Sequence, residues 1–129
     1  MSKVLLVEDD QFLSSLLKNR LLREQFEVVT AEDGAKALEA LKTMRPDVML
    51  LDIILPGKSG FEVLEELRGD PRFQGKNMFP VIIISNLGQE SDLERSRELG
   101  AVDYFVKARS SIDEIAKKAR EVIAKKPGG

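Results

Sequence analysis

Short apolar segments alternate along the chain with longer stretches in which apolar residues recur at helical spacing. The apolar segments are residues 4–7 (VLLV), 27–30 (EVVT), 48–51 (VMLL), 81–84 (VIII) and 102–106 (VDYFV). Segments of this length, rich in valine and isoleucine, are typical of parallel strands that are covered on both faces. The stretches between them predict helices, the first of which carries Phe12, Leu13, Leu16, Leu17, Leu21 and Leu22. The repeated alternation predicts an α/β fold with one parallel five-stranded sheet.

Proline and glycine mark the expected ends of the predicted helices. Pro46 is expected to end the second helix, and Gly100 to cap the fourth. The fourth helix differs from the others because Leu93 and Leu99 are its only large apolar residues, a stripe thinner than the face of a well-anchored helix. Two interpretations of this helix stay open. It is either an exposed helix at a sheet edge or a weakly held element that can shift.

Polar residues follow four of the apolar segments at their carboxyl ends. They are Glu8, Asp9 and Asp10 after the first segment, Asp52 after the third, Ser85 after the fourth and Lys107 after the fifth. The carboxyl ends of parallel strands meet at one edge of a sheet, where open α/β sheets bind ligands. We therefore predict a crevice in which several carboxylates face one lysine. Repulsion between these carboxylates requires either a proton or a bound cation, and oxygen ligands favour Mg²⁺.

Each of these residues also has an ordinary structural explanation when it is taken alone. The acidic run at 8–10 is suited to capping the following helix, Lys107 to a solvated loop and Ser85 to a strand end. Asp52 is harder to explain, because apolar residues flank it and an unpaired buried carboxylate is costly. A carboxylate beside a metal ion can attack phosphorus, with Lys107 balancing the charge of the acyl phosphate. Their convergence at one edge favours a functional site.

The composition excludes several classes of protein. The 129 residues suffice for one domain, and a net charge of −2 provides no basic surface for nucleic acid or membrane lipids. The chain has no cysteine and no histidine, which excludes a disulfide, a thiol nucleophile and a histidine base. No apolar run approaches the ~20 residues of a membrane span, and we expect a cytoplasmic protein.

The segments VLLVEDD, DIILPGKSG, VIIIS and GAVDYFVKA, in this order and spacing, resemble the receiver domain of bacterial two-component response regulators. The resemblance implies a flavodoxin-like (βα)5 three-layer sandwich with strand order 2-1-3-4-5. It implies a receiver domain over residues 1–125, followed by a flexible tail at 126–129. We expect a stand-alone phosphorelay protein, similar to a chemotaxis receiver, that is not an enzyme acting on a separate substrate.

The resemblance also implies a role for the acidic residues of the predicted crevice. Asp52 matches the phosphoacceptor of the family. Glu8 and Asp9, together with Asp52 and the backbone carbonyl of Ile54, match the site that holds Mg²⁺ or Mn²⁺. The implied phosphodonor is a sensor histidine kinase or a histidine phosphotransfer protein, because this chain has no histidine of its own.

Three further residues match positions that respond to the phosphoryl group. Ser85 and Lys107 match the residues that bind it, and Asp52 and Lys107 match those that carry the transfer reaction. Ser85 and Tyr104 match the pair that switches after phosphorylation. The switch is expected to change the surface of the fourth helix, fifth strand and fifth helix, and thereby the binding of a downstream protein partner.

Two positions depart from the family pattern, and a third predicts the lifetime of the signal. Ala108 stands where most receivers have proline, and Asn86 where many have alanine. A cis bond before alanine costs about 2.5–4 kcal/mol, so we expect either a trans bond after Lys107 or strain. Ile54 is expected to project near Asp52, because residues two apart in an extended segment face the same way. Its apolar side chain predicts slow autodephosphorylation.

A rival interpretation belongs to a different class of protein. It is a structural or protein-interaction module, natural or engineered, that keeps the fold but is not phosphorylated. The presence of Glu8, Asp9, Asp52, Ser85 and Lys107 together argues against it.

Overall fold

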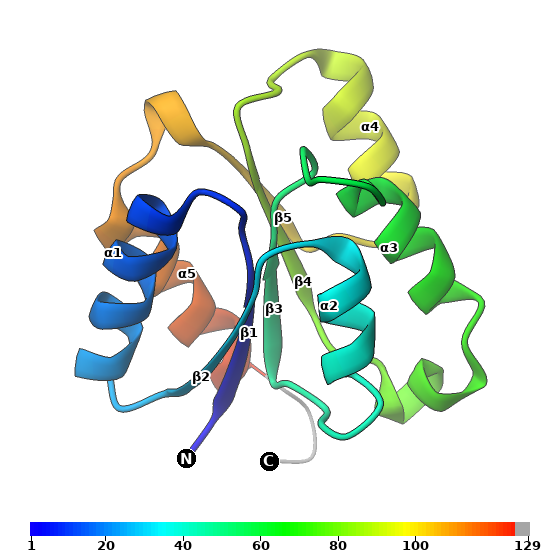
Figure 1. The fold of residues 1–129 in the computed structure, drawn as a ribbon, viewed down its shortest axis with the longest axis horizontal. Helices are drawn as coiled ribbons and strands as arrows, with labels where there is room; N and C mark the ends of the chain where they lie inside the picture. The colour runs from blue at the N-terminus through cyan, green and yellow to red at the C-terminus, as the bar shows by residue number, and fades with distance from the viewer. Residues whose placement is uncertain (126–129) are drawn as a thin grey trace.

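The predicted alternation of strands and helices is present in the computed structural model, which describes residues 1–125 (Figure 1). The strands are β1 (Lys3–Val7), β2 (Glu27–Ala31), β3 (Val48–Leu51), β4 (Val81–Ser85) and β5 (Asp103–Val106). The helices are α1 (Gln11–Arg23), α2 (Gly34–Ala40), α3 (Gly60–Arg68), α4 (Glu90–Glu98) and α5 (Ile112–Ala124). The tail predicted at 126–129 lies outside the described residues. No helix in residues 1–125 is long and apolar enough to cross a membrane.

The sheet has the predicted strand order, β2-β1-β3-β4-β5, and all neighbouring strands are parallel. Helices α1 and α5 cover one face, and α2, α3 and α4 lie on the other (Figure 1). Successive strand residues point to opposite faces, so Leu5 packs in the core beneath α2 and α3, whereas Leu6 packs beneath α1 and α5. The predicted three-layer α/β fold is confirmed. The strand order reverses between β1 and β3, which opens a crevice at their carboxyl ends.

The second helix ends earlier than the sequence predicts. It stops at Ala40, well before Pro46, and Leu41 is its C-cap residue. The chain continues in a tight turn in which the amide of Lys42 donates to the carbonyl of Glu39, three residues back. The prediction that Pro46 ends the helix is wrong. Leu41 continues the apolar spacing of the helix and is buried, although it lies in the turn and not in α2. The apolar pattern therefore extends beyond the end of the helix.

The predicted glycine cap of the fourth helix is confirmed. Gly100 has φ +84°, a left-handed conformation that glycine adopts without steric cost. Its amide donates to the carbonyl of Arg97, and the amide of Ala101 donates to the carbonyl of Ser96, both at 2.9 Å. These two bonds form a Schellman motif that ends α4.

The thin apolar stripe of α4 corresponds to an exposed helix beside the edge strand β5. Ser96 is its only buried residue. Arginines link this helix to α3: Arg95 of α4 donates to the carboxylate of Glu65 at 2.7 Å, and Arg68 of α3 donates to the carbonyl of Leu99, the C-cap residue of α4. The guanidinium of Arg95 also lies 4.4 Å from the centre of the buried Phe61 ring, in a cation–π contact. Polar contacts thus replace part of the apolar burial that fixes the other helices.

Candidate functional site

The predicted polar residues converge at the carboxyl edge of the sheet. Val7 pairs with Leu51 in the β1–β3 ladder, so Glu8 and Asp52 follow neighbouring strand ends. Ser85 is the last residue of β4, and Lys107 follows β5. An open cavity of about 220 Å³ lies at this edge, lined by Asp9, Asp10, Asp52, Ile54, Asn86 and Lys107. The crevice predicted from the sequence is therefore present.

Backbone contacts fix the position of Asp52. Its amide donates to the carbonyl of Val7 at 3.0 Å, which continues the sheet by one residue, and its Oδ1 accepts from the amide of Ile54 at 3.1 Å. The start of α3 presses against the same segment, and the amide of Gly60 donates to the carbonyl of Ile53 at 2.8 Å. A Cβ atom at position 60 would lie 2.2 Å from the carbonyl oxygen of Asp52. Only glycine permits this approach.

The sequence prediction does not include Gly60 among the site residues. The available signal is a glycine at the first position of the third helix, directly after the cap residue Ser59. A glycine at a helix start is also common for reasons unrelated to a site, so this signal does not identify a close backbone approach. The contact becomes evident only when α3 is placed against the end of β3.

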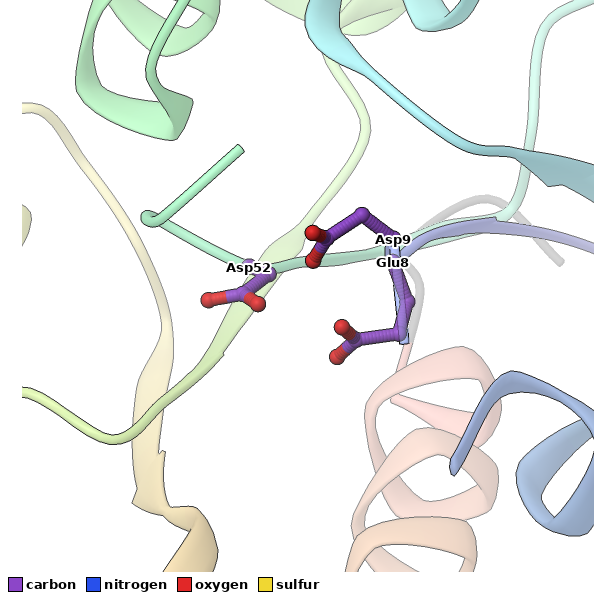
Figure 2. Close-up of side chains that lie close together, drawn as sticks. All are labelled: Glu8, Asp9 and Asp52. Carbon is purple, nitrogen blue, oxygen red and sulfur yellow. The ribbon is translucent and has the colours of Figure 1, made fainter. Parts of the chain in front are cut away.

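Glu8, Asp9 and Asp52 form a cluster of carboxylates. Each presents one oxygen, and these three oxygens lie within 4.8 Å of one another. Figure 2 shows the side chains of Glu8 and Asp9 extending from the end of β1 toward Asp52. Glu8 and Asp52 are 1% and 2% exposed, whereas Asp9 faces solvent. The cluster therefore combines two buried acids with one that water or an ion can reach.

Lys107 is shared by the two buried carboxylates. Its Nζ lies 2.8 Å from Oδ2 of Asp52 and 2.8 Å from Oε1 of Glu8. Burial acts to lower the pKa of Lys107, but the bonds to Asp52 and Glu8 outweigh it and raise that pKa overall. One positive charge thus faces two buried negative charges. The prediction that several carboxylates face one lysine is confirmed.

Glu8 shows the consequence of this imbalance. Its Oε2 accepts from the amide of Asp10 at 3.0 Å. Among the described residues, no group reaches its Oε1 with good hydrogen-bond geometry, although Nζ of Lys107 forms an ion pair with it. Burial, the largest influence, and the nearby charge of Asp52 raise the pKa of Glu8 to about 7, against the ion pair with Lys107 and the hydrogen bond from the amide of Asp10. The site is therefore poised to take up a proton or a cation.

The acidic run at 8–10 serves two purposes. Asp10 is the N-cap of α1, and its Oδ1 accepts from the amides of Phe12 and Leu13 at 3.0 and 3.1 Å. Glu8 and Asp9 instead belong to the carboxylate cluster. The run thus has both of the roles considered for it: Asp10 caps the helix, and Glu8 and Asp9 belong to the carboxylate cluster.

Ser85 and Tyr104 meet at the loop that follows β4. The hydroxyl of the buried Ser85 accepts from the amide of Leu87 at 3.3 Å, and the hydroxyl of Tyr104 donates to the carbonyl of the same residue at 2.5 Å. Burial raises the pKa of Tyr104, and the charge of Asp92 adds to this. The two predicted switch residues thus contact one loop.

The segment after Lys107 has ordinary peptide geometry. No cis peptide bond occurs within residues 1–125, so the bond before Ala108 is trans. Residues 107–109 form a short 3-10 turn that leads into α5. Of the two alternatives left open for this bond, trans geometry or strain, the structure has the trans bond.

This fold places an acidic crevice at the edge where open α/β sheets bind their ligands. The model of the response regulator receiver domain family matches residues 4–120. The chain therefore belongs to this family, whose members are signalling modules of two-component systems rather than catalytic enzymes. Receiver domains accept a phosphoryl group from histidine kinases, and the acidic cluster at the carboxyl edge is typical of their metal site.

Individual relatives agree with this assignment. The alkaline phosphatase synthesis transcriptional regulatory protein PhoP of Bacillus subtilis is 39% identical over 105 residues, covering 81% of this chain and 42% of the relative. The transcriptional regulatory protein CpxR of Escherichia coli K12 is 42% identical over 107 residues, covering 83% and 43%. The chain thus spans less than half the length of these relatives. The receiver domain of the Francisella response regulator 1452 superposes with TM-score 0.87 at 27% identity, covering 97% of this chain and 98% of that one.

Proposed function

We propose that residues 1–125 form a receiver in which Asp52 accepts a phosphoryl group from the phosphohistidine of a sensor kinase or of a phosphotransfer protein. The observation that carries the proposal is the buried Asp52 carboxylate, 2.8 Å from Lys107 and clustered with Glu8 and Asp9. An oxygen of Asp52 forms a bond to phosphorus while the bond between phosphorus and the donor imidazole breaks. Lys107 then faces the transferred phosphoryl oxygens.

The donor set suits a hard divalent cation. Glu8, Asp9 and Asp52 each present one oxygen within 4.8 Å of the others, and Lys107 pairs with only two of these three carboxylates. Oε1 of Glu8 lacks a hydrogen bond of good geometry among the described residues, and the pKa of Glu8 is raised. We propose that Glu8, Asp9, Asp52 and the backbone carbonyl of Ile54 hold Mg²⁺, or Mn²⁺, with water completing the coordination. A bound ion would balance the negative charge that accumulates on the phosphoryl oxygens.

The proposed output starts at Ser85 and Tyr104, which both bond Leu87. A phosphoryl group on Asp52 offers the Ser85 hydroxyl an anionic acceptor, and bonds to anions are stronger than neutral ones. Movement of Ser85 toward it changes the contact with Leu87 and therefore the position of Tyr104. The surface of α4, β5 and α5 then changes its affinity for a downstream protein.

Incubation with acetyl phosphate and Mg²⁺, followed by intact-mass measurement, tests the proposal. The wild-type chain should gain one phosphoryl group, and Asp52→Asn should gain none, because the amide is not a nucleophile. Asp113→Asn removes an exposed carboxylate on α5 and should gain mass as the wild type does. A wild-type protein that gains no mass would support the rival interaction module. A phosphorylated Asp52→Asn variant would refute the assignment of the acceptor.

Ile54 bears on the lifetime of the phosphorylated state. Ile54 is 52% exposed and lines the same cavity as Asp52. A branched apolar side chain at this position cannot bond a water molecule in line with phosphorus. Slow autodephosphorylation is therefore expected, and Ile54→Asn should accelerate it. The measurement is the decay of phosphoprotein after removal of acetyl phosphate in excess Mg²⁺, and equal rates would contradict the shielding.

A further inference from the structure

The wall of the 220 Å³ cavity contains a single neutral polar side chain, that of Asn86. Asn86 is exposed, and among residues 1–125 the structure records no hydrogen bond to its carboxamide. A carboxamide offers two donor hydrogens and one acceptor oxygen. It is therefore free to bond a molecule that enters the cavity. Asn86 is not among the residues proposed above as phosphoacceptor, metal ligands or switch.

Loss of the signal requires a water molecule to enter this same cavity, a step that rests on the proposed phosphorylation of Asp52. The water oxygen forms a bond to phosphorus opposite the Asp52 oxygen, and the bond between phosphorus and that oxygen breaks. The electron pair returns to the Asp52 carboxylate, and the protons of the water remain on inorganic phosphate. The water must be held in line with the breaking bond, next to anionic phosphoryl oxygens that repel its lone pairs.

The other side chains of the wall are poorly placed to hold this water. Asp10 uses Oδ1 as the cap of α1, and its carboxylate carries a negative charge that phosphoryl oxygens repel. Lys107 is shared by two carboxylates. Asp9 is a proposed metal ligand, and a carboxylate would add to the negative charge around phosphorus. Ile54 has no polar atom in its side chain. Of the side chains that line the cavity, the carboxamide of Asn86 is the one suited to hold the water molecule.

We infer that Asn86 is a catalytic residue of autodephosphorylation, whose carboxamide positions the hydrolytic water on phosphorylated Asp52. The amide oxygen accepts a hydrogen from the water while the amide nitrogen donates to a phosphoryl oxygen, and the neutral group adds no charge. Its backbone directly follows Ser85, the last residue of β4, and β4 is the neighbour of β3 in the sheet. The carboxamide is thus attached to a rigid strand end beside the one that carries Asp52.

The inference is tested by the decay of phosphoprotein in four proteins. Wild type, Asn86→Ala, Asn86→Leu and Asn77→Ala are phosphorylated with acetyl phosphate and Mg²⁺, the donor is removed, and intact mass is followed. Asn77→Ala is the matched control, because Asn77 is an exposed asparagine in the 3-10 turn before β4, outside the cavity wall. The leucine side chain resembles that of asparagine in size but has no polar atom. The Asn86→Leu variant therefore distinguishes an effect of the amide group from an effect of side-chain size.

Both Asn86 variants should decay about three- to tenfold more slowly than wild type, the size of one neutral hydrogen bond, while Asn77→Ala decays at the wild-type rate. Asn86→Ala decay at or above the wild-type rate would overturn the inference. Slow decay in Asn86→Leu alone would also overturn it, since bulk rather than the amide would then be responsible. Equal decay in proteins that are all phosphorylated refutes only the role of Asn86. A wild-type protein that gains no phosphoryl group refutes the proposed function itself.

Discussion

Two charge clusters of this molecule differ in their balance and in their burial. In the crevice, one lysine faces the buried carboxylates of Glu8 and Asp52, each at 2.8 Å. Between α1 and α5, two arginines face two carboxylates in a network nearer the surface. Its members are Arg20, Glu24, Asp113 and Arg120. The crevice cluster carries more negative than positive charge, whereas the helix cluster is neutral.

The two clusters shift the pKa of their glutamates in opposite directions. A hydrogen bond from Arg20 is the largest influence on Glu24 and lowers its pKa. Burial is the largest influence on Glu8 and raises its pKa to about 7. The helix cluster is satisfied by its own members. The crevice cluster is completed only by a proton or a cation from outside, which is the behaviour expected of a functional site.

The largest expected effect comes from removing the lysine of the crevice. Lys107→Ala leaves two buried carboxylates without a cation, and breaking a buried ion pair in this way costs on the order of 3 kcal/mol of unfolding free energy. Urea unfolding of the metal-free protein at pH 8 measures it. Lys117→Ala removes an exposed lysine of α5 and should change little. Equal effects of the two substitutions would show that the crevice charges are not coupled as described.

A smaller effect is expected from pH. The pKa of folded Glu8 is about 7 and its ordinary value is 4.5, so between them the folded state binds more protons than the unfolded state. The contribution of Glu8 to the unfolding free energy of the metal-free protein should therefore fall, on the order of 2 kcal/mol, as pH rises from 5 to 8. Glu8→Gln should remove this fall, and Glu24→Gln should not. A fall that persists in Glu8→Gln would assign it to another group.

Metal affinity should distinguish Asp9 from Asp10, two neighbouring residues of the acidic run. Asp9→Asn should weaken Mg²⁺ binding about tenfold or more, roughly 1.4 kcal/mol, because the ion loses a charged ligand. Asp10→Asn is the matched control, since asparagine also caps helices and Asp10 lines the same cavity. Isothermal titration calorimetry distinguishes the two. Unchanged affinity in Asp9→Asn would remove Asp9 from the metal site.

The smallest effect is expected in the helix cluster. Arg20→Ala removes two ion pairs at the surface, which water and salt already weaken. The urea midpoint should move much less than in Lys107→Ala, and the difference from wild type should vanish at high salt. A shift as large as that of Lys107→Ala would show that burial does not separate the two clusters.

Several features of the molecule follow from local properties of the sequence. The five apolar segments become β1 to β5 within one residue of their expected ends. The residues after these segments then had to meet at one edge, because parallel strands share their direction. Gly100 likewise caps α4 as expected, since a left-handed residue after a helix requires glycine for local steric reasons. The absence of histidine and cysteine limits the chemistry without reference to any fold.

The pairing of the polar groups depends on how the strands and helices are arranged in space. Lys107 lies between Glu8 and Asp52 because β1, β3, β4 and β5 stand in that order in the sheet, and spacing along the chain does not encode that order. The run at 8–10 divides into a helix cap and site carboxylates because α1 begins at Gln11, and its composition alone allowed either role. The close approach of Gly60 to Asp52 depends on how α3 packs on β3. Periodicity is a property of neighbouring residues, whereas charge pairing and burial depend on contacts between residues tens of positions apart.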